Sequence, residues 1–166
     1  MTLETMRCCV EVWPVAADEH AICLVSGGDA WRSPSIPSDS EPHWEAEFLI
    51  AGHEQVQPVL LHSTSWRAEG PTVVLTYVAV FACEGLVLDR WSQALPISTD
   101  LLPTVGKPYR HGAAEVPIPR YVDVLLHALR HCRLLRDTDA VAKEVLSGHW
   151  AAHLDALEPA LSGMYQ

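Results

Sequence analysis

Two closely spaced apolar segments between residues 59 and 83 constrain the fold of this chain more than any other stretch. Residues 72–81, TVVLTYVAVF, are almost wholly β-branched, aromatic or apolar. Such a run is typical of a central strand that is buried on both faces. Residues 60–67, LLHSTSWR, predict a second strand, and residues 68–71, AEGP, have the composition of a turn. The sequence therefore predicts a β-hairpin at the centre of a sheet.

The register of this hairpin decides which side chains share a face. A regular register with Arg67 opposite Thr72 places His62 opposite Tyr77. A dense group of donors on such a strand can bind a carboxylate or phosphate, with Arg67 supplying a bidentate contact. The alternative is that the hydroxyl groups bond across the strands and Arg67 is solvated at the turn. The candidate ligand-binding residues are His62, Ser63, Thr64, Ser65, Arg67 and Tyr77.

Length and cysteine content indicate a single cytoplasmic domain. The 166 residues suit one core. Within it we expect a sheet-rich part over residues 7–102, a proline-rich crossing over residues 103–119 and C-terminal helices over residues 120–160. Residues 1–7 lack the apolar core of a signal peptide. The five cysteines contain no CxxC pair, which is typical of a reducing compartment.

Charge and hydrophobicity narrow the classes of partner. A net charge of −10 with 11 Lys and Arg residues argues against nucleic acid and against anionic membranes. An apolar fraction of 49% and six tryptophans indicate a self-association surface, and we expect a homodimer. The tryptophans line either such an interface, a pocket or the core. An acidic small molecule or a protein is the expected partner, and no cofactor is predicted.

Several shorter segments predict further strands. Residues 7–15 alternate as a first strand, with Pro14 placing its end near a sheet edge. Residues 20–25, closed by a Gly-Gly turn over residues 26–29, predict a second strand and a hairpin. Residues 85–89 predict another strand, and residues 98–102 predict a short capped turn.

Residues 41–52, EPHWEAEFLIAG, fit two interpretations. Alternating apolar residues indicate a strand, whereas Pro42 in the first turn, acidic residues at the N-terminal end and Gly52 at the other end indicate a helix. We favour the helix because the residues at both ends agree with it.

The C-terminal part predicts helices. Residues 120–136 carry a wide apolar arc at helical spacing, and the pattern continues over residues 139–157 with Gly148 as a kink. The expected fold class is α/β (α+β), with a mixed, mainly antiparallel sheet packed by helices and a C-terminal helical hairpin.

Histidines at helical spacing suggest a metal site. Asp123, His127 and His131 share one helix face, as metal ligands require, so a divalent metal is a second candidate for this region. Arg130 would repel a cation there. His149 and His153 repeat the spacing but are expected to face the core, so the two pairs should not converge.

The order of elements resembles a degenerate Nudix fold. The resemblance rests on LVSGG at residues 24–28, the acidic segment 41–52, the paired strands of residues 59–83 and a C-terminal helix. The family holds magnesium with an Arg-Glu pair followed by two adjacent glutamates on one helix, an arrangement that Glu41, Glu45 and Glu47 lack. The resemblance therefore implies the fold without the reaction. HSTSWR and LTYVAVF are also similar to segments of small actinomycete proteins.

These observations predict a non-catalytic domain that binds a small ligand or another protein. The alternative is a divergent Nudix-like hydrolase that acts on a phosphorylated small molecule, with its pocket around residues 62–67.

Overall fold

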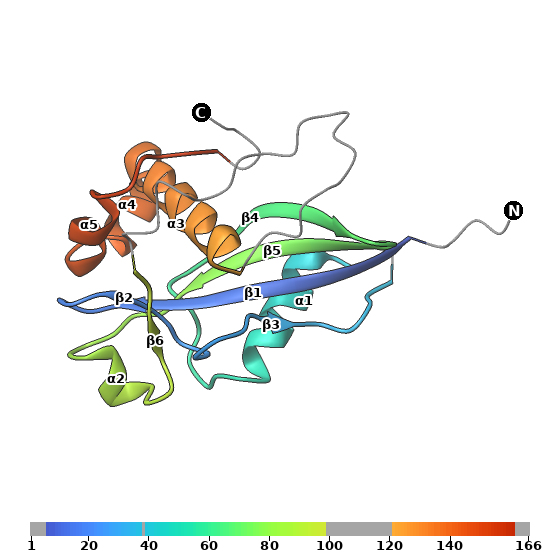
Figure 1. Ribbon diagram of the computed structural model, residues 1–166, viewed down its shortest axis with the longest axis horizontal. Helices are drawn as coiled ribbons and strands as arrows, with labels where there is room; N and C mark the ends of the chain where they lie inside the picture. The colour runs from blue at the N-terminus through green and yellow to red at the C-terminus, as the bar shows by residue number, and fades with distance from the viewer. Residues whose placement is uncertain (1–5, 38, 99–120, 162–166) are drawn as a thin grey trace, which may run out of the picture.

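A computed structural model describes residues 6–37, 39–98 and 121–161 of the chain. Six strands form one sheet in the order β4–β5–β1–β2–β6, and β3 pairs with β1 (Figure 1). β1 and β5 run parallel, whereas the other pairs of described strands are antiparallel. The strands are β1 (Arg7–Ala17), β2 (Ile22–Leu24), β3 (Trp31–Arg32), β4 (Leu60–Glu69), β5 (Thr72–Val80) and β6 (Leu95–Pro96).

Helices cover both faces of this sheet, which confirms the predicted fold class. The C-terminal helices lie on one face and α1 lies on the other (Figure 1). The helices are α1 (Pro42–Ala51), α2 (Val87–Arg90), α3 (Tyr121–Thr138), α4 (Ala140–Val145) and α5 (His149–Leu154). In the part of the chain that the structure describes, no helix is long and apolar enough to span a membrane.

Each face of the sheet has its own apolar cluster because side chains alternate along β1 and β5. Trp13, Val15 and Val78 pack with Leu125 and Leu129 of α3. Val10, Val12, Tyr77 and Ala79 pack on the other face with Ala46 and Ile50 of α1. We call these the α3 face and the α1 face.

The predicted central strand is confirmed, but the expected position of Pro14 near a sheet edge is wrong. β5 lies between β4 and β1, and β1 continues to Ala17 within the sheet. On its side away from β5, β1 pairs with β3 at residues 11–12 and with β2 at residues 15–17. Pro14 lies between these two pairings, where its missing N–H removes little from the ladder, and its carbonyl accepts from the Val25 N–H at 2.8 Å.

The β4–β5 hairpin is confirmed, but its expected register is wrong. Glu69, not Arg67, lies opposite Thr72, because the loop contains only Gly70 and Pro71. Gly70 has a φ of 58°, which glycine adopts without strain in a two-residue hairpin loop. The register then shifts at a bulge between Ser63 and Ser65.

The ambiguous segment 41–52 is a helix, as favoured from its ends, and the predicted hairpin of β1 and β2 is present. The strand expected over residues 85–89 is absent. The chain turns at Gly85, with a φ of 88°, and enters α2 instead. The N–H of Val87, the first residue of α2, donates to the buried Asp18 carboxylate at 2.8 Å. The turn expected at residues 98–102 lies largely outside the described residues, as does the crossing expected over residues 103–119.

The C-terminal helices turn back along α3, as predicted. Asp139 caps α4 by accepting from the Ala142 N–H at 2.7 Å. Gly148 has a φ of 62° and separates α4 from α5, so the predicted kink is a complete break in the helix.

Candidate functional site

The predicted ligand-binding residues lie on both faces of the sheet, and the bulge in β4 changes which of them share a face. Ser63 lies opposite Tyr77 on the α1 face, whereas Ser65 lies opposite Thr76 on the α3 face. His62 and Arg67 also face α3, although their separation in a regular strand would put them on opposite faces. Thr64, at the bulge, is buried, and its hydroxyl lies 3.4 Å from the Thr76 carbonyl oxygen.

The α3 face carries a buried ion pair between β1 and β4. The two terminal guanidinium nitrogens of Arg67 donate to the two carboxylate oxygens of Glu11 at 2.7 and 2.8 Å. Thr76, which lies between them on β5, donates to Glu11 at 3.2 Å and accepts from Arg67 at 3.1 Å. The Trp13 indole N–H also donates to Glu11, at 3.2 Å. The Glu11 side chain is 6% exposed, so the carboxylate is almost fully removed from water.

The ion pair extends towards the hairpin loop. Arg67 Nε donates to Glu69 at 2.9 Å, and Glu69 also accepts from Arg32 of β3. Burial by itself would raise the pKa of Glu69, but the hydrogen bonds from Arg32 and Arg67 bring it below its ordinary value. Burial would lower the pKa of Arg67, but the hydrogen bonds from its guanidinium to Glu11 raise it. Both residues are therefore fully charged at neutral pH.

This network determines what Arg67 can do chemically. Its three guanidinium nitrogens already donate to carboxylates in a bidentate and a further contact. An anionic ligand would have to compete with two carboxylates that are fixed by the sheet. The arrangement fits a structural ion pair better than a binding site for an acidic small molecule. Ligand binding by these residues stays a prediction.

Sequence reasoning did not single out Glu11, the central residue of this network. The available signal was an acidic side chain within the apolar run of β1, on the same strand face as Cys9 and Trp13. A buried carboxylate of this kind needs a cationic partner. Its partner could not be identified because the register that places Arg67 opposite Val74 depends on the two-residue loop at Gly70 and Pro71, which differs from the turn predicted over residues 68–71.

A second polar contact on the α3 face joins β4 to α3. His62 Nε2 and His131 Nε2 lie 3.1 Å apart, with the two rings stacked at a centroid distance of 5.0 Å. His131 is buried, and burial together with the neighbouring His62 and His127 lowers its pKa from 6.5 to about 4. Burial also lowers the pKa of His62. Both imidazoles are therefore neutral at pH 7, and one donates to the other.

The geometry around His131 allows the proton to be assigned. His131 Nδ1 is buried and has no hydrogen-bond partner among the residues that the structure describes. A buried N–H donor without an acceptor is costly, so Nδ1 carries the lone pair and Nε2 carries the proton. His131 Nε2–H then donates to His62 Nε2. A metal bound between the two Nε2 atoms would force the proton onto Nδ1, where no second-shell acceptor receives it.

Of the predicted metal ligands, His131 lies beside another donor, namely His62. Among the described residues, no group of three or more His, Cys, Asp and Glu side chains could hold a metal ion. Burial and the nearby Arg130 lower the pKa of His127. The expectation that His127 and His131 point to solvent or a cleft is wrong for His131, which is buried. The expectation that His149 and His153 face the core is wrong for His149, which is exposed, whereas His153 is half-buried and turns inward to bond the carbonyl of the buried Asp18 at 2.7 Å.

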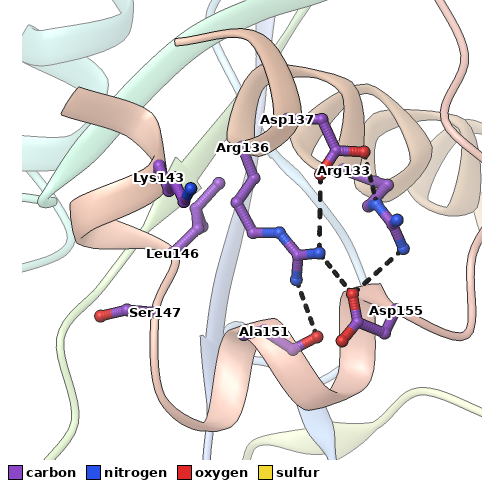
Figure 2. A pocket seen from close by; sticks show the side chains of 8 residues that line it. All are labelled: Arg133, Arg136, Asp137, Lys143, Leu146, Ser147, Ala151 and Asp155. Atoms are coloured by element: carbon purple, nitrogen blue, oxygen red, sulfur yellow. Dashed lines mark hydrogen bonds and ion pairs between the residues drawn. The ribbon is translucent and has the colours of Figure 1, made fainter. Parts of the chain in front are cut away.

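A cleft of about 580 Å³ lies between α3, α4 and α5 (Figure 2). Arg136 reaches from α3 to the Ala151 carbonyl at 2.8 Å and to the Asp155 carboxylate. Arg133 donates to Asp137 at 2.7 Å and forms an ion pair with Asp155. Both guanidinium groups are used in these contacts. The two arginines therefore hold α5 against α3, and we call them the clamp.

A further candidate site, an exposed aromatic surface, lies on the outer side of α1. Trp44 and Phe48, one helical turn apart, are 70% and 80% exposed. We call this pair the aromatic stripe. Four other tryptophans are buried, namely Trp13, Trp31, Trp91 and Trp150, so the predicted core role holds for these four, whereas an interface stays a prediction for the exposed ones. An apolar stripe on the solvent side of a helix is typical of a surface that contacts another molecule.

No protein-family model and no curated protein matches the chain.

Proposed function

We propose that this chain is a non-catalytic protein-interaction domain whose contact surface is the aromatic stripe of α1. The observation that carries the proposal is the exposure of Trp44 and Phe48. The opposite side of the same helix is already packed on the sheet through the buried Ala46 and Ile50. Large aromatic side chains contribute strongly to protein interfaces when a partner covers them.

The anchoring of α1 supports this proposal. Ala46 and Ile50 pack on the α1 face of the sheet. Just beyond the helix, the His53 ring stacks on Trp31 at 4.6 Å, and Glu54 accepts from the Trp91 indole at 3.1 Å. The helix is therefore held at its centre and at its C-terminal end, and the aromatic stripe is presented on a rigid element, which lowers the entropic cost of binding.

The polar network on the α3 face supports the non-catalytic part of the proposal. Arg67 is paired with Glu11, and His62 is paired with His131. A side chain that serves as a general base or anion clamp must be able to leave its resting contact for the substrate. These side chains instead join β1, β4 and α3.

Site-specific cross-linking tests the proposal. A photoreactive phenylalanine analogue at position 48 should form a discrete adduct with a partner in cells that produce the chain, and Trp44→Ala should abolish the adduct. The same analogue at Leu88, an exposed residue of α2, is the matched control. Equal adducts from positions 48 and 88, or an adduct that survives Trp44→Ala, would contradict a specific surface.

We also propose a homodimer through the edge strand β4. β4 is ten residues long, forms one end of the described sheet and carries Trp66, which is 69% exposed. Two such edges can pair across a twofold axis. Light scattering over a hundredfold concentration range tests this proposal. A constant mass of 18.3 kDa would contradict it, and Trp66→Lys should shift a dimer to that mass.

A further inference from the structure

We infer that the partner of the aromatic stripe is a basic, apolar polypeptide segment, such as a helix with Leu-type side chains flanked by Lys or Arg. The inference rests on the proposed function and adds the chemistry of the partner. It follows from the charges that surround Trp44 and Phe48.

The stripe lies in the most acidic part of the chain. Between Arg32 and Arg67 there is no Lys or Arg, whereas five acidic residues occur, namely Asp39, Glu41, Glu45, Glu47 and Glu54. This segment includes the whole of α1. Its net charge of −5, with His neutral, is half of the total charge of −10.

Three of these carboxylates frame the stripe itself. On a helix of about 3.6 residues per turn, Glu45 and Glu47 fall on opposite sides of the line through Trp44 and Phe48. Glu41, the residue before the helix, falls near its N-terminal end. Glu47 lies 3.6 Å from His43, and both side chains are about half exposed. A covering partner would therefore meet aromatic rings at the centre and negative charge on both sides.

This frame selects among the macromolecules that could cover the stripe. A second copy of the chain, with α1 against α1, would bring two such acidic segments together, and like charges at an interface are unfavourable. An anionic lipid surface would be repelled for the same reason. A basic, apolar segment satisfies both the rings and the carboxylates, in the manner of an amphipathic helix docked on an apolar surface.

Synthetic helical peptides provide the test with the purified full-length chain. Three fluorescent probes of equal length are needed: one with a Leu face flanked by Lys, one with the same Leu face flanked by Glu, and one with Lys but without the Leu face. We expect the Leu/Lys probe to bind at least tenfold more tightly than either of the others, and to weaken as salt is added.

Two pairs of variants locate the binding. Trp44→Ala with Phe48→Ala should weaken the Leu/Lys probe at least tenfold, whereas the exposed Trp66→Ala should not. Glu45→Lys with Glu47→Lys should weaken the Leu/Lys probe and strengthen the Leu/Glu probe. Glu84→Lys with Asp89→Lys changes the net charge equally, at exposed positions in and just before α2, and should leave both affinities within about twofold.

Each remaining outcome overturns the inference. If the Leu/Lys and Leu/Glu probes bind equally tightly, or if no probe binds, the carboxylates do not select a basic partner. If Glu84→Lys with Asp89→Lys weakens the Leu/Lys probe as much as Glu45→Lys with Glu47→Lys does, the net charge of the chain, and not the position of the carboxylates, determines the affinity. Self-association that Trp44→Ala with Phe48→Ala abolishes would identify a second copy as the occupant. The proposed function itself is judged separately, by the cross-link at position 48.

Discussion

The Nε2 atoms of His62 and His131 lie 3.1 Å apart and join the edge strand β4 to α3. His62 follows the loop from α1, and His131 is buried in the third turn of α3, 69 residues later. The contact therefore attaches the C-terminal helices to the sheet through two neutral imidazoles.

Stability should fall as the pH is lowered from about 6.5 towards 4. The pKa of His131 in the folded chain is about 4, below the 6.5 of an exposed histidine, so the unfolded chain binds a proton first as the pH falls. The stabilisation is fully present above pH 6.5 and is lost as the pH approaches 4. The pKa values of His62 and His127, which face His131, are also lowered, so both groups change the stability in the same direction. Urea melts should show a slope of up to about 1.4 kcal/mol per pH unit for each such proton.

A matched pair of variants assigns this slope. His131→Leu should flatten the pH dependence of the unfolding free energy between pH 6.5 and 5, because it removes the most strongly shifted group. His149→Leu, at an exposed histidine of α5, should leave the slope unchanged. An unaltered slope in His131→Leu would show that the contact with His62 is not the source.

Arg67→Met should destabilise the chain more than Glu11→Gln. Loss of Arg67 leaves the buried Glu11 carboxylate without its cation, which costs about 3 kcal/mol or more. Glu11→Gln costs about 1–2 kcal/mol, because Arg67 keeps its contact with Glu69 and glutamine still offers an acceptor. Denaturant melts compare the two. The double variant Glu11→Leu with Arg67→Met should recover stability relative to Arg67→Met, and a further loss instead would contradict a buried pair.

Thr64→Val should cost about 1 kcal/mol of stability, since it removes the hydroxyl that contacts the Thr76 carbonyl and keeps the shape of the side chain. Ser63→Ala, at the adjacent exposed position, should be nearly neutral. Chemical denaturation measures both. If Thr64→Val is neutral, the hydroxyl does not stabilise the bulge, and a role in ligand binding becomes the better explanation of this residue.

Arg136→Gln should loosen α5 while leaving the sheet intact. The change removes the contacts of the guanidinium with the Ala151 carbonyl and Asp155. Hydrogen exchange followed by mass spectrometry should show faster exchange over residues 149–154 and unchanged protection in β1 and β5. Uniformly faster exchange would indicate that the clamp supports the whole fold, contrary to the expectation.

The chain should not release phosphate or nucleoside monophosphate from nucleoside diphosphate compounds with Mg²⁺. Glu45 and Glu47 fall on opposite flanks of α1, so one ion cannot be held by both. A phosphate-release assay with and without EDTA measures this. EDTA-sensitive turnover would favour the divergent hydrolase and contradict the non-catalytic proposal.

Local sequence was enough to predict several elements. β5 could be predicted because seven of its nine residues are β-branched or aromatic, and such a run is typical of a strand buried on both faces. α1 could be predicted from its ends, because Pro42 and Gly52 have backbone preferences that do not depend on the rest of the fold. The C-terminal helices followed from the apolar period of residues 120–136.

The arrangement of the polar side chains was decided only by the tertiary structure. The bulge at Thr64 places His62 and Arg67 on one face of β4, and no local preference specifies this bulge. Glu11 meets Arg67 across β5 only because β1 runs parallel to that strand in a particular register. Sequence also could not distinguish the buried Trp91 from the exposed Trp44. Backbone propensity depends on neighbouring residues, whereas register and exposure depend on the sum of contacts between strands and helices distant in the chain.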